Sequence, residues 1–503
     1  MVERTGPRVF SIAPGVPFLP SLIDAIRDGR LVPGFPRDES DPMALARATI
    51  YVPTRRAART LRSLLVERSP VKSAILPVIR PLGDVDEDAA LFDLGSEAPL
   101  DLLPPMNATE RLLLLASLVR PWRERLPEHV RSLFGNEEVA IPATTADAIW
   151  LARDLAGLMD QVETEASGWA TLGNIVTEDL PNWWQVTLEF LNIVTSLWPQ
   201  ILEERRRSNP AAHRNRLIER EAERLRRNPP SGPVIAAGST GSLPATAKLL
   251  GAIASLPSGA VVLPGLDREL DAASWDMLAK AADDPSTFGH PQYGLRKLLG
   301  ELKVLKEDVV PLGAAAPERQ ARSRLVSEAM RPAGTSDAWA RLDRESEQFA
   351  RATASVCVVE AANEREEALA AALALREALD EPSRTVALVT ADRDLARRVA
   401  TELARFNIVA DDSGGHSLRE TQPATLMRLA LETTFNPGDP VALLALLKHP
   451  LARLGAQQGR ARSAAATLEL VALRGGTGRA TLADLGCLPV RPPLPGVSAR
   501  LLA

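Results

Sequence analysis

Short apolar runs alternate with helical periodicity near the amino terminus, and this alternation predicts strands followed by helices. The first strand is expected at Arg8–Ala13, and a Pro-Gly turn and a helix over about Leu19–Arg27 follow it. A second run of β-branched and aromatic residues, Thr49–Val52, ends at Pro53, which cannot donate a ladder hydrogen bond. The pattern therefore predicts two consecutive strand–turn–helix units.

The helix after the second strand has two contrasting faces. Apolar residues at helical spacing form its expected buried stripe, namely Ala57, Ala58, Leu61, Leu64 and Leu65. Arg55, Arg59 and Arg62 share the opposite face, with Arg56 beside them. Thr54 is expected to cap the helix, so free N–H groups and the positive end of the helix dipole lie near these arginines. This combination suits a phosphate, although a solvated basic face on an ordinary helix has the same pattern.

Between residues 106 and 229 the periodicity is helical throughout, which predicts an α-helical insertion. Its large apolar side chains are expected in the core rather than in a stacking platform for bases: Trp122, Trp150, Met159, Trp169, Trp183, Trp184 and Trp198. The insertion closes with nine arginines and five glutamates between Glu203 and Arg227. These mixed charges favour a solvated helix that pairs its own charges.

Strand character returns after the insertion. Pro233–Ala237 and Ala260–Leu263 are expected to be strands, with a turn at Gly238–Gly241 and a helix capped by Ser242 between them. A polar passage rich in Ala, Pro and Arg follows at Gly313–Glu347.

The alternation then resumes in a further unit. Its expected elements are a strand at Val356–Val359, a helix at Asn363–Leu379, a strand at Thr385–Thr390 and a helix capped by Asp392. Strands that alternate with helices on both sides of the insertion predict an α/β protein with two parallel-sheet domains.

Composition narrows the class of protein. The 503 residues indicate about three domains or subdomains, and the low aromatic content of 4% indicates aliphatic, helix-rich cores. The net charge of −5 argues against a uniformly basic nucleic-acid coat but allows local basic grooves. Cys357 and Cys487 form no CxxC pair, which argues against a disulfide framework or a zinc knuckle. The amino terminus lacks a secretory pattern and no apolar run could cross a bilayer, so we expect a cytoplasmic protein without membrane contact.

Polar turns follow three of the expected strands. In an open parallel sheet, ligands collect at the carboxyl ends of strands, where turns meet helix N-termini. The three turns are Pro53-Thr54-Arg55-Arg56, Gly238-Ser239-Thr240-Gly241-Ser242 and Thr390-Ala391-Asp392-Arg393. Their repeated placement favours a phosphate-binding edge over a plain charged surface.

The first βα turn lacks the chemistry of an ATP site. A phosphate loop needs GxxxxGK[ST], because backbone N–H groups cradle the phosphates, the lysine neutralises the terminal one and the hydroxyl binds magnesium. Residues 13–20 read APGVPFLP, with no lysine, no hydroxyl and three prolines that donate no N–H. The strand at Val234–Ala237 likewise ends without the Asp-Glu pair that would bind the metal. We therefore expect no cofactor in this chain.

Catalytic chemistry is sparse elsewhere. No two of the five histidines have a spacing that is typical of metal ligands. They are His129, His213, His290, His416 and His449. The sequence contains no GxSxG nucleophile elbow. Asp411 and Asp412 are adjacent carboxylates, whose expected role is in a turn. We predict no catalytic residue and no metal ligand.

Several segments in combination are similar to the AddB subunit family of the AddAB helicase–nucleases, in its alphaproteobacterial form. They are VFSIAPGVPFLPSL (9–22), DGRLVPGFPRD (28–38), YVPTRRAARTLRSLL (51–65), LPVIRPLGDVDED (76–88), VIAAGSTGSLPATAKLL (234–250), HPQYGL (290–295), VALVTADRDLARRVATEL (386–403) and DDSGG (411–415). The resemblance extends to about Leu473 and is lost after about Gly475.

The resemblance implies a fold of two RecA-like domains of the UvrD-like superfamily 1 helicase type. The first domain would comprise residues 1–105 and 230–345, and its ATP site would be degenerate. Residues 106–229 would form the helical insertion. The second domain would comprise 354–503, with a helical insertion from about 420, and its completeness stays open.

The resemblance also implies a function. The chain would be a non-motor, helicase-like DNA-binding subunit that acts in double-strand break repair by homologous recombination. An AddA-like subunit would complete a heterodimer and carry the motor and its ATP and Mg²⁺, and both single- and double-stranded DNA would be bound. Thr54, Arg55 and Arg56 match the helicase motif that holds single-strand phosphates, next to Arg59 and Arg62. Thr240, Gly241 and Ser242, and later Thr390, Asp392 and Arg393, would line the same DNA channel.

One departure from the family concerns the carboxyl-terminal part. Family members continue into a nuclease domain with an iron–sulfur cluster on four cysteines, whereas this sequence stops at Ala503 without that motif. We therefore expect the nuclease and the cluster to be absent from this chain, so that the chain alone is not catalytic. Two alternatives stay open: an α/β enzyme that uses a nucleotide or sugar phosphate, and an assembly scaffold without DNA contact.

Overall fold

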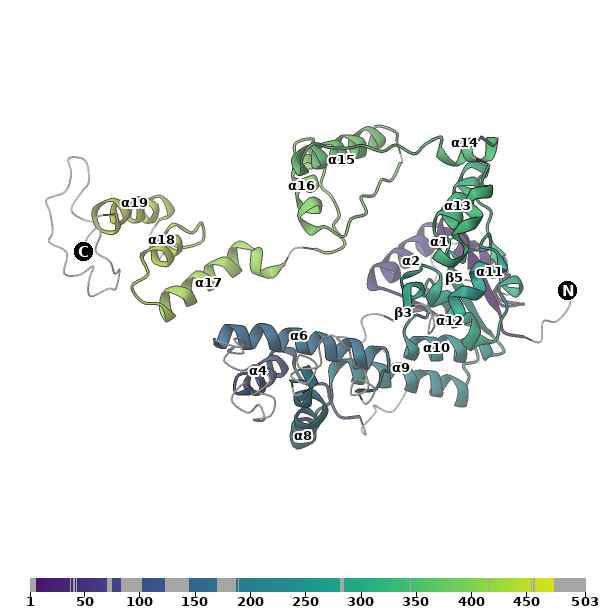
Figure 1. Cartoon of the computed structure of the whole chain (residues 1–503), viewed down its shortest axis with the longest axis horizontal. Helices are drawn as coiled ribbons and strands as arrows, with labels where there is room; N and C mark the ends of the chain where they lie inside the picture. Colours follow the sequence, from purple (N-terminus) through teal and green to yellow (C-terminus); the bar gives the residue numbers. More distant parts are fainter. Residues whose placement is uncertain are drawn as a thin grey trace. The chain divides into compact units, whose positions relative to one another are not determined.

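The computed structural model describes residues 6–474, except for 37, 39–40, 42, 70–74, 83–101, 123–143, 170–186, 189, 281–284, 344, 383, 416, 454 and 456. The chain divides into two compact units, Met1–Val356 and Cys357–Ala503 (Figure 1). Five residues that the sequence analysis considered singly lie outside the described residues, namely His129, Trp183, Trp184, His416 and Cys487.

The first unit contains a six-stranded, all-parallel sheet with the order β3-β2-β4-β5-β1-β6. Its strands are β1 (Val9–Ile12), β2 (Thr49–Val52), β3 (Val78–Pro81), β4 (Val234–Ala237), β5 (Gly259–Pro264) and β6 (Val310–Leu312). Strands from both sides of the helical insertion therefore join one sheet. The predicted α/β class is confirmed.

Strands β3 and β6 are the two that the sequence pattern did not predict. Each is short and contains a proline, Pro81 in β3 and Pro311 in β6, and proline lowers the strand signal of a sequence. Both strands lie at the edges of the sheet. Proline is tolerated there, because an edge strand leaves one row of backbone groups without a ladder partner.

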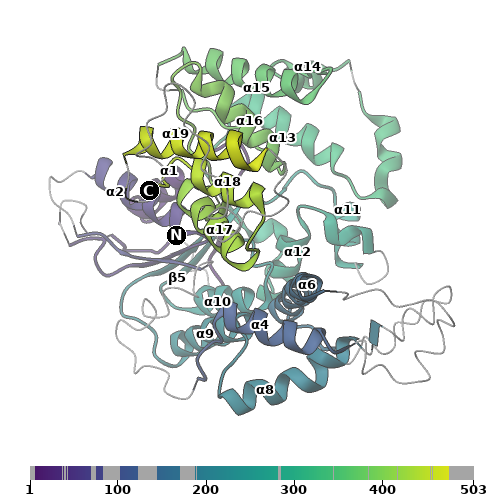
Figure 2. The same cartoon turned by 90° about the vertical axis from the view of Figure 1, so that its left-hand side faces the viewer.

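Two layers of helices cover the sheet, one on each face (Figure 2). Helices α1 (Phe18–Arg27) and α2 (Arg55–Glu67) pack on the side chains of Ile12, Ile50 and Val52. The opposite layer packs on Val9, Tyr51 and Val261 and contains α9 (Pro210–Arg227), α10 (Pro244–Ser255) and α12 (Tyr293–Leu302). Both layers form because successive residues of a strand point to opposite faces.

The insertion between β3 and β4 has an apolar core of its own. Its described helices are α4 (Ala108–Val119), α6 (Thr145–Thr164), the π-helix η4 (Ile193–Leu197), α8 (Trp198–Arg205) and α9. Leu115, Met159 and Trp198 are buried at its centre. Trp122 packs edge-on against Phe190, with ring centroids 5.2 Å apart.

Core packing of the tryptophans is confirmed for Trp122, Trp169 and Trp198. It is wrong for Trp150, which is 57% exposed. The guanidinium carbon of Arg153 lies 4.7 Å from the centroid of the Trp150 ring, so a neighbour on the same helix covers part of the indole.

Helix α9 differs from the solvated helix that its charges predicted. It buries five apolar side chains, Ala211, Leu217, Ile218, Ala222 and Leu225, together with the charged side chain of Glu221. Some charges do pair within the helix, as in the 2.9 Å contact of Arg227 with Glu223. The prediction failed because charged residues outnumber apolar ones in this helix. The apolar residues nevertheless form a narrow stripe that faces the core.

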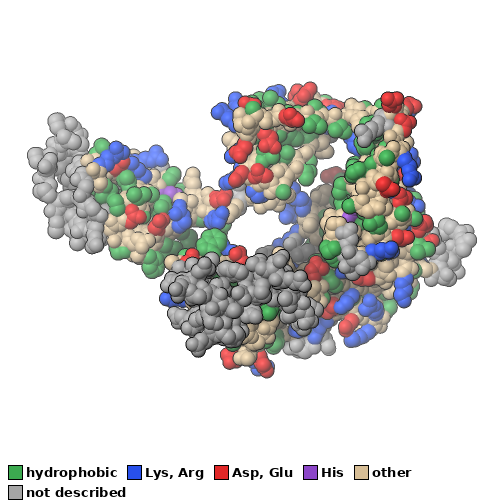
Figure 3. All heavy atoms as spheres, viewed as in Figure 1, with side chains coloured by type: hydrophobic (Ala, Val, Ile, Leu, Met, Phe, Trp, Pro, Cys, Tyr) green, Lys and Arg blue, Asp and Glu red, His purple; other side chains and the backbone are tan. Residues whose placement is uncertain are grey.

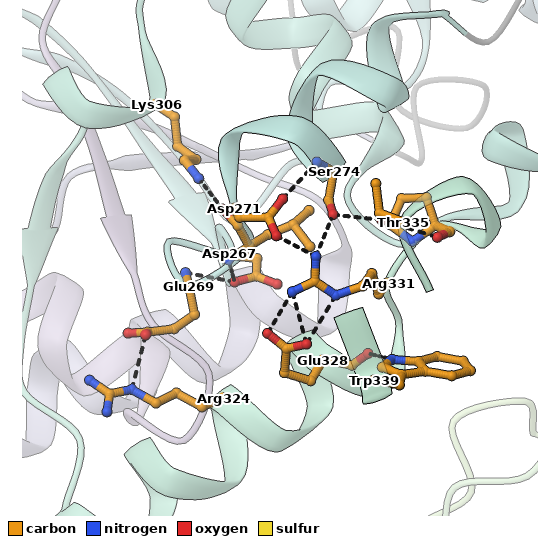
Figure 4. A network of polar contacts seen from close by, with 12 residues as sticks. Asp267, Glu269, Asp271, Ser274, Lys306, Arg324, Glu328, Arg331, Thr335 and Trp339 are labelled. Atoms are coloured by element: carbon orange, nitrogen blue, oxygen red, sulfur yellow. Dashed lines mark hydrogen bonds and ion pairs between the residues drawn. The ribbon is translucent and has the colours of Figure 1, made fainter. Parts of the chain in front are cut away.

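Short helical elements complete the first unit. They are α11 (Ala272–Met277), η5 (Leu278–Lys280), η6 (Pro285–Gly289), η7 (Lys306–Asp308), α13 (Pro317–Ala329), η8 (Ala333–Arg341) and α14 (Glu347–Thr353). Arg331 joins α11 to α13, because its guanidinium donates to the carboxylates of Asp271 and Glu328 and to Ser274 Oγ (Figure 4). Hydrogen bonds from Arg331 and from the Ser274 backbone lower the pKa of Asp271 to about 2.

The second unit is helical among its described residues. Its elements are α15 (Glu364–Leu379), α16 (Arg393–Ala404), η9 (Leu418–Glu420), α17 (Gln422–Phe435), α18 (Pro440–Lys448), α19 (Gln458–Leu468) and the π-helix η10 (Glu469–Leu473). Helices α15 and α16 pack through Ala368, Ala372, Val399 and Leu403. The two helices that the sequence predicted here are confirmed.

The strands predicted at Val356–Val359 and Thr385–Thr390 are wrong. Neither segment forms a ladder, and Val358 and Val389 are 83% and 93% exposed. No strand occurs among the described residues of this unit, so they contain no second parallel sheet. A β-branched run becomes a strand only where a neighbouring strand takes up its backbone groups and side chains.

Candidate nucleic-acid interface

The turns that follow β2 and β4 lie against each other. The two strands are neighbours in the sheet, with Tyr51 beside Ala236. A Cβ built on Gly238 would lie 3.4 Å from the Pro53 ring, so little space separates the two turns. Gly238 also has a φ of +85°, which favours glycine. The structure therefore brings together two of the three turns that the sequence singled out.

The helices that leave these two turns cover opposite faces of the sheet. Helix α2 follows β2 and packs in one layer, whereas α10 follows β4 and packs in the other. Neighbouring parallel strands with this arrangement form a topological switch point, where ligands of open α/β sheets bind. The β2–β4 switch point is therefore a candidate ligand site of this sheet.

The start of α2 has the predicted cap and the predicted charge. Thr54 Oγ1 accepts a hydrogen bond from the Ala57 backbone N–H at 3.1 Å, which confirms the cap. Arg56 and Arg59 are exposed and Arg55 is half-buried. We call Thr54, Arg55, Arg56 and Arg59 the phosphate grip. These residues place positive charge and a helix N-terminus at the same edge.

Arg62 differs from the other arginines of this helix. Its Nη2 donates to the Ile79 carbonyl at 3.1 Å and so ties α2 to β3. The opposite side of the helix is buried through Ala58, Leu61 and Leu65, as the apolar stripe predicted. The structure thus gives Arg62 a packing role one helical turn beyond the phosphate grip.

The turn at Gly238–Ser242 is shaped by two glycines and a hydroxyl. The Gly241 N–H donates to Ser239 Oγ at 3.2 Å, and Gly241 has a φ of +60° and is buried against Leu298. Thr240 is half-buried and Ser242 is exposed. The predicted Ser242 cap is wrong, because Pro244 takes the first helical position and Leu243 precedes it as the N-cap.

The first βα turn is closed on itself and covered by an arginine. The Val16 N–H donates to the Ala13 carbonyl at 3.2 Å. The Gly15 carbonyl accepts from Arg319 of α13 at 2.8 Å, and a Cβ on Gly15 would lie only 3.1 Å from that side chain. A phosphate cradle needs backbone N–H groups that point outward, whereas this turn presents a carbonyl to a guanidinium.

The third predicted turn belongs to the second unit. Asp392 caps α16 by accepting from the Asp394 and Leu395 N–H groups at 2.7 and 3.2 Å. Arg393 donates to both carboxylate oxygens of Asp412, at 3.0 and 2.6 Å. The N–H of Asp392 donates to Thr390 Oγ1 at 3.0 Å. Thr390, Asp392 and Arg393 therefore build a local turn with the DDSGG segment.

The role of Asp412 agrees with the turn that the sequence predicted, because its Oδ1 accepts from the Gly414 N–H at 2.8 Å.

Among the described residues, no three His, Cys, Asp or Glu side chains gather to form a metal site. No helix of the described part is long and apolar enough for a membrane span.

A buried polar cluster on the face of the sheet opposite α2 was missed by sequence reasoning. Tyr51 OH donates to Glu221 of α9, and Arg80 of β3 contacts the same carboxylate at 3.1 Å. Arg224 closes the cluster with contacts of 2.7 and 2.9 Å to the two Glu221 oxygens. The available signal was a glutamate at helical spacing among buried apolar positions such as Leu217 and Leu225.

The pKa values of this cluster follow from burial and pairing. Burial, followed by the negative charge of Glu221, raises the pKa of the Tyr51 hydroxyl well above its usual range. Burial opposes ionisation of Glu221, but hydrogen bonds from Arg224 and Tyr51 outweigh it and lower the pKa of that carboxyl. The stable form is a neutral phenol with a carboxylate between two guanidinium groups.

Charges of both signs are mixed over the described surface seen in Figure 3, in keeping with the small net charge of −5. The charge that distinguishes the β2–β4 edge is therefore local.

The sequence matches no model of a known protein family and no curated protein.

Proposed function

We propose that this protein is a helicase-like DNA-binding subunit, which holds single-stranded DNA by its phosphates at the β2–β4 edge. The observation that carries the proposal is the closeness of the turn at Pro53 to the turn at Gly238, at the ends of two paired strands. It places the capped, arginine-rich start of α2 at a switch point of the sheet. Thr240 and Ser242 add two hydroxyl groups from the neighbouring strand end, on either side of the buried Gly241.

The chemistry of the phosphate grip suits a nucleic-acid backbone better than a base. Arginine binds phosphate oxygens through a planar fork of N–H donors, and the helix N-terminus adds its partial positive charge. Arg56 and Arg59 lie three positions apart on the exposed side of one helix, so they can contact successive phosphates. Such contacts carry no sequence information, so binding of this kind is independent of sequence.

The proposal assigns movement along DNA to another subunit. The first βα turn supports this, because Arg319 covers Gly15 where a motor protein would expose N–H groups to a nucleotide. The wider assignment rests on the resemblance to AddB. It comprises a RecA-like fold for the first unit, a heterodimer with an AddA-like motor and nuclease subunit, and cytoplasmic double-strand break repair by homologous recombination.

Equilibrium binding of a labelled oligothymidylate tests the proposal. The wild-type protein is expected to bind at low salt, and the variant Arg55→Ala/Arg56→Ala is expected to bind more weakly. Unchanged affinity of that variant would reject the grip.

A thermal-shift titration with ATP and with sugar phosphates is the second arm of this test. Stabilisation by one of these small molecules, together with no oligonucleotide binding, would favour a phosphate-using enzyme. Binding to a motor subunit without any DNA binding would favour an assembly scaffold.

A further inference from the structure

Helix α9 contacts the insertion with its first half and the sheet with its second half. The N-cap residue Asn209 donates to the Glu163 side chain, and Asn215 Nδ2 in the first half donates to the Glu163 carbonyl at 2.7 Å. Arg214 Nη2 donates to Thr164 Oγ1 at 3.0 Å. These three contacts hold the carboxyl-terminal end of α6, the 20-residue helix of the insertion.

In the second half of α9, Glu221 reaches two neighbouring strands. Tyr51 of β2 and Arg80 of β3 occupy paired register positions, and both contact the Glu221 carboxylate. The Glu221 side chain is only 4% exposed. One buried carboxylate therefore joins two strands to the helix that carries the insertion.

Tyr51 lies in the strand that leads directly to the phosphate grip. Val52 and Pro53 are the only residues between Tyr51 and Thr54. β2 is paired with β3 over Thr49–Val52 and with β4 over Thr49–Tyr51, so Tyr51 is held between two neighbouring strands close to the end of β2. The Thr54 hydroxyl in turn fixes the first turn of α2 through the Ala57 N–H.

We infer that Glu221 is a positioning residue for the phosphate grip, because it couples the helical insertion, through α9, to the strand that presents Thr54 and Arg55. This inference rests on the proposed function. Glu221 does not contact DNA. It sets where the end of β2, and therefore the start of α2, lies relative to the turn at Gly238.

The variant Glu221→Gln tests the coupling, because it keeps the size of the side chain and removes its charge. The guanidinium groups of Arg80 and Arg224 then lose the negative charge that holds them in the buried cluster. We expect amide hydrogen exchange at Ala57 and Ala58 to accelerate about five- to thirtyfold, relative to the central strands of the sheet. Oligothymidylate affinity should fall, while its salt dependence stays that of the wild type because the number of phosphate contacts is unchanged.

Two further variants keep the test decisive. Glu223→Gln is the matched control, because Glu223 lies on the same helix and pairs with Arg227 in an exposed position. It should leave both readouts unchanged. Tyr51→Phe removes only the hydroxyl contact and keeps the ion pairs, so it should reproduce a smaller part of the effect if Glu221→Gln does not fold.

The outcomes separate the coupling from the proposed function. Equal exchange at Ala57 and Ala58 in the folded wild type, Glu221→Gln and Tyr51→Phe would overturn the coupling, even if global stability fell. Failure of the wild type to bind oligothymidylate would reject the proposed function alone. The exchange measurement, which needs no DNA, would still decide whether Glu221 positions the start of α2.

Discussion

Tyr51 and Glu221 are 170 positions apart, yet the hydroxyl of the first donates a hydrogen bond to the carboxylate of the second. Tyr51 lies in β2, next to the edge strand β3, and Glu221 lies in α9 at the end of the helical insertion. Both side chains are buried. The contact therefore links the insertion to the sheet. Because the Tyr51 hydroxyl is titratable, its ionisation can report whether this contact is intact.

Stability at alkaline pH should report this contact. The folded state holds the Tyr51 proton more tightly than the unfolded chain, whose tyrosine pKa is about 10. The contribution of Tyr51 is therefore complete below pH 10 and is lost as the pH rises above it, by about 1.4 kcal/mol per pH unit. Denaturant unfolding of wild type and Tyr51→Phe on either side of that pH should show a shallower loss in the variant. Equal slopes would contradict the buried hydrogen bond.

The chain has two tyrosines, so the same proton can be followed directly. In the variant Tyr293→Phe, Tyr51 is the only tyrosine. Its tyrosinate absorbance should appear together with the loss of the circular dichroism signal, because ionisation of the buried phenol requires unfolding. Absorbance that rises near pH 10 in the folded protein would show that Tyr51 is accessible.

The ion pair of Asp271 and Arg331 should stabilise the protein mainly above acidic pH. The pKa of Asp271 is lowered from 3.8 to about 2, so its contribution is present above the unfolded value and is lost as the pH falls through the folded one. Asp271→Asn keeps an efficient helix cap for α11 but removes the charge. Acid unfolding between about pH 4 and pH 2 should therefore be less steep in this variant than in the wild type. An identical acid profile would show that the pair contributes nothing.

The cap of α2 should matter for stability and for binding. Thr54→Ala removes the acceptor for the Ala57 N–H and is expected to cost about 1 kcal/mol of unfolding free energy. Thr54→Ser keeps the acceptor and should restore most of that loss. Denaturant midpoints of the three proteins measure the difference. Oligothymidylate affinity should follow the same order, because the cap also orients Arg55 and Arg56.

Local sequence signals were sufficient for the parts of the fold that depend on neighbours in the chain. The β-branched run at Thr49–Val52, the capping hydroxyl of Thr54 and the apolar stripe of α2 all predicted what the structure shows. The closeness of Gly238 to Pro53 could not be predicted in the same way. It depends on the order of strands in the sheet, which is set by packing between distant segments.

Two predictions failed because burial overrides local pattern. Glu221 lies among so many charges that the helix reads as solvated, but the side chain is buried because Arg80 and Tyr51 lie opposite it. Val358 and Val389 have the residue type of a strand, yet they find no neighbouring strand among the described residues. A pattern in sequence states what a segment favours, and tertiary partners decide whether it forms.

The salt dependence of single-strand binding tests the central claim most directly. Each phosphate contact contributes a slope of about 0.7 to the decrease of log affinity with log salt concentration. The triple variant Arg55→Ala/Arg56→Ala/Arg59→Ala should bind oligothymidylate more weakly and lose about 2 units of that slope. The control Arg216→Ala/Arg226→Ala/Arg227→Ala removes the same charge from exposed positions of α9, on the other face of the sheet, and should keep the wild-type slope. A triple variant of the grip with the slope of the wild type, or a wild type that does not bind at low salt, would contradict the account.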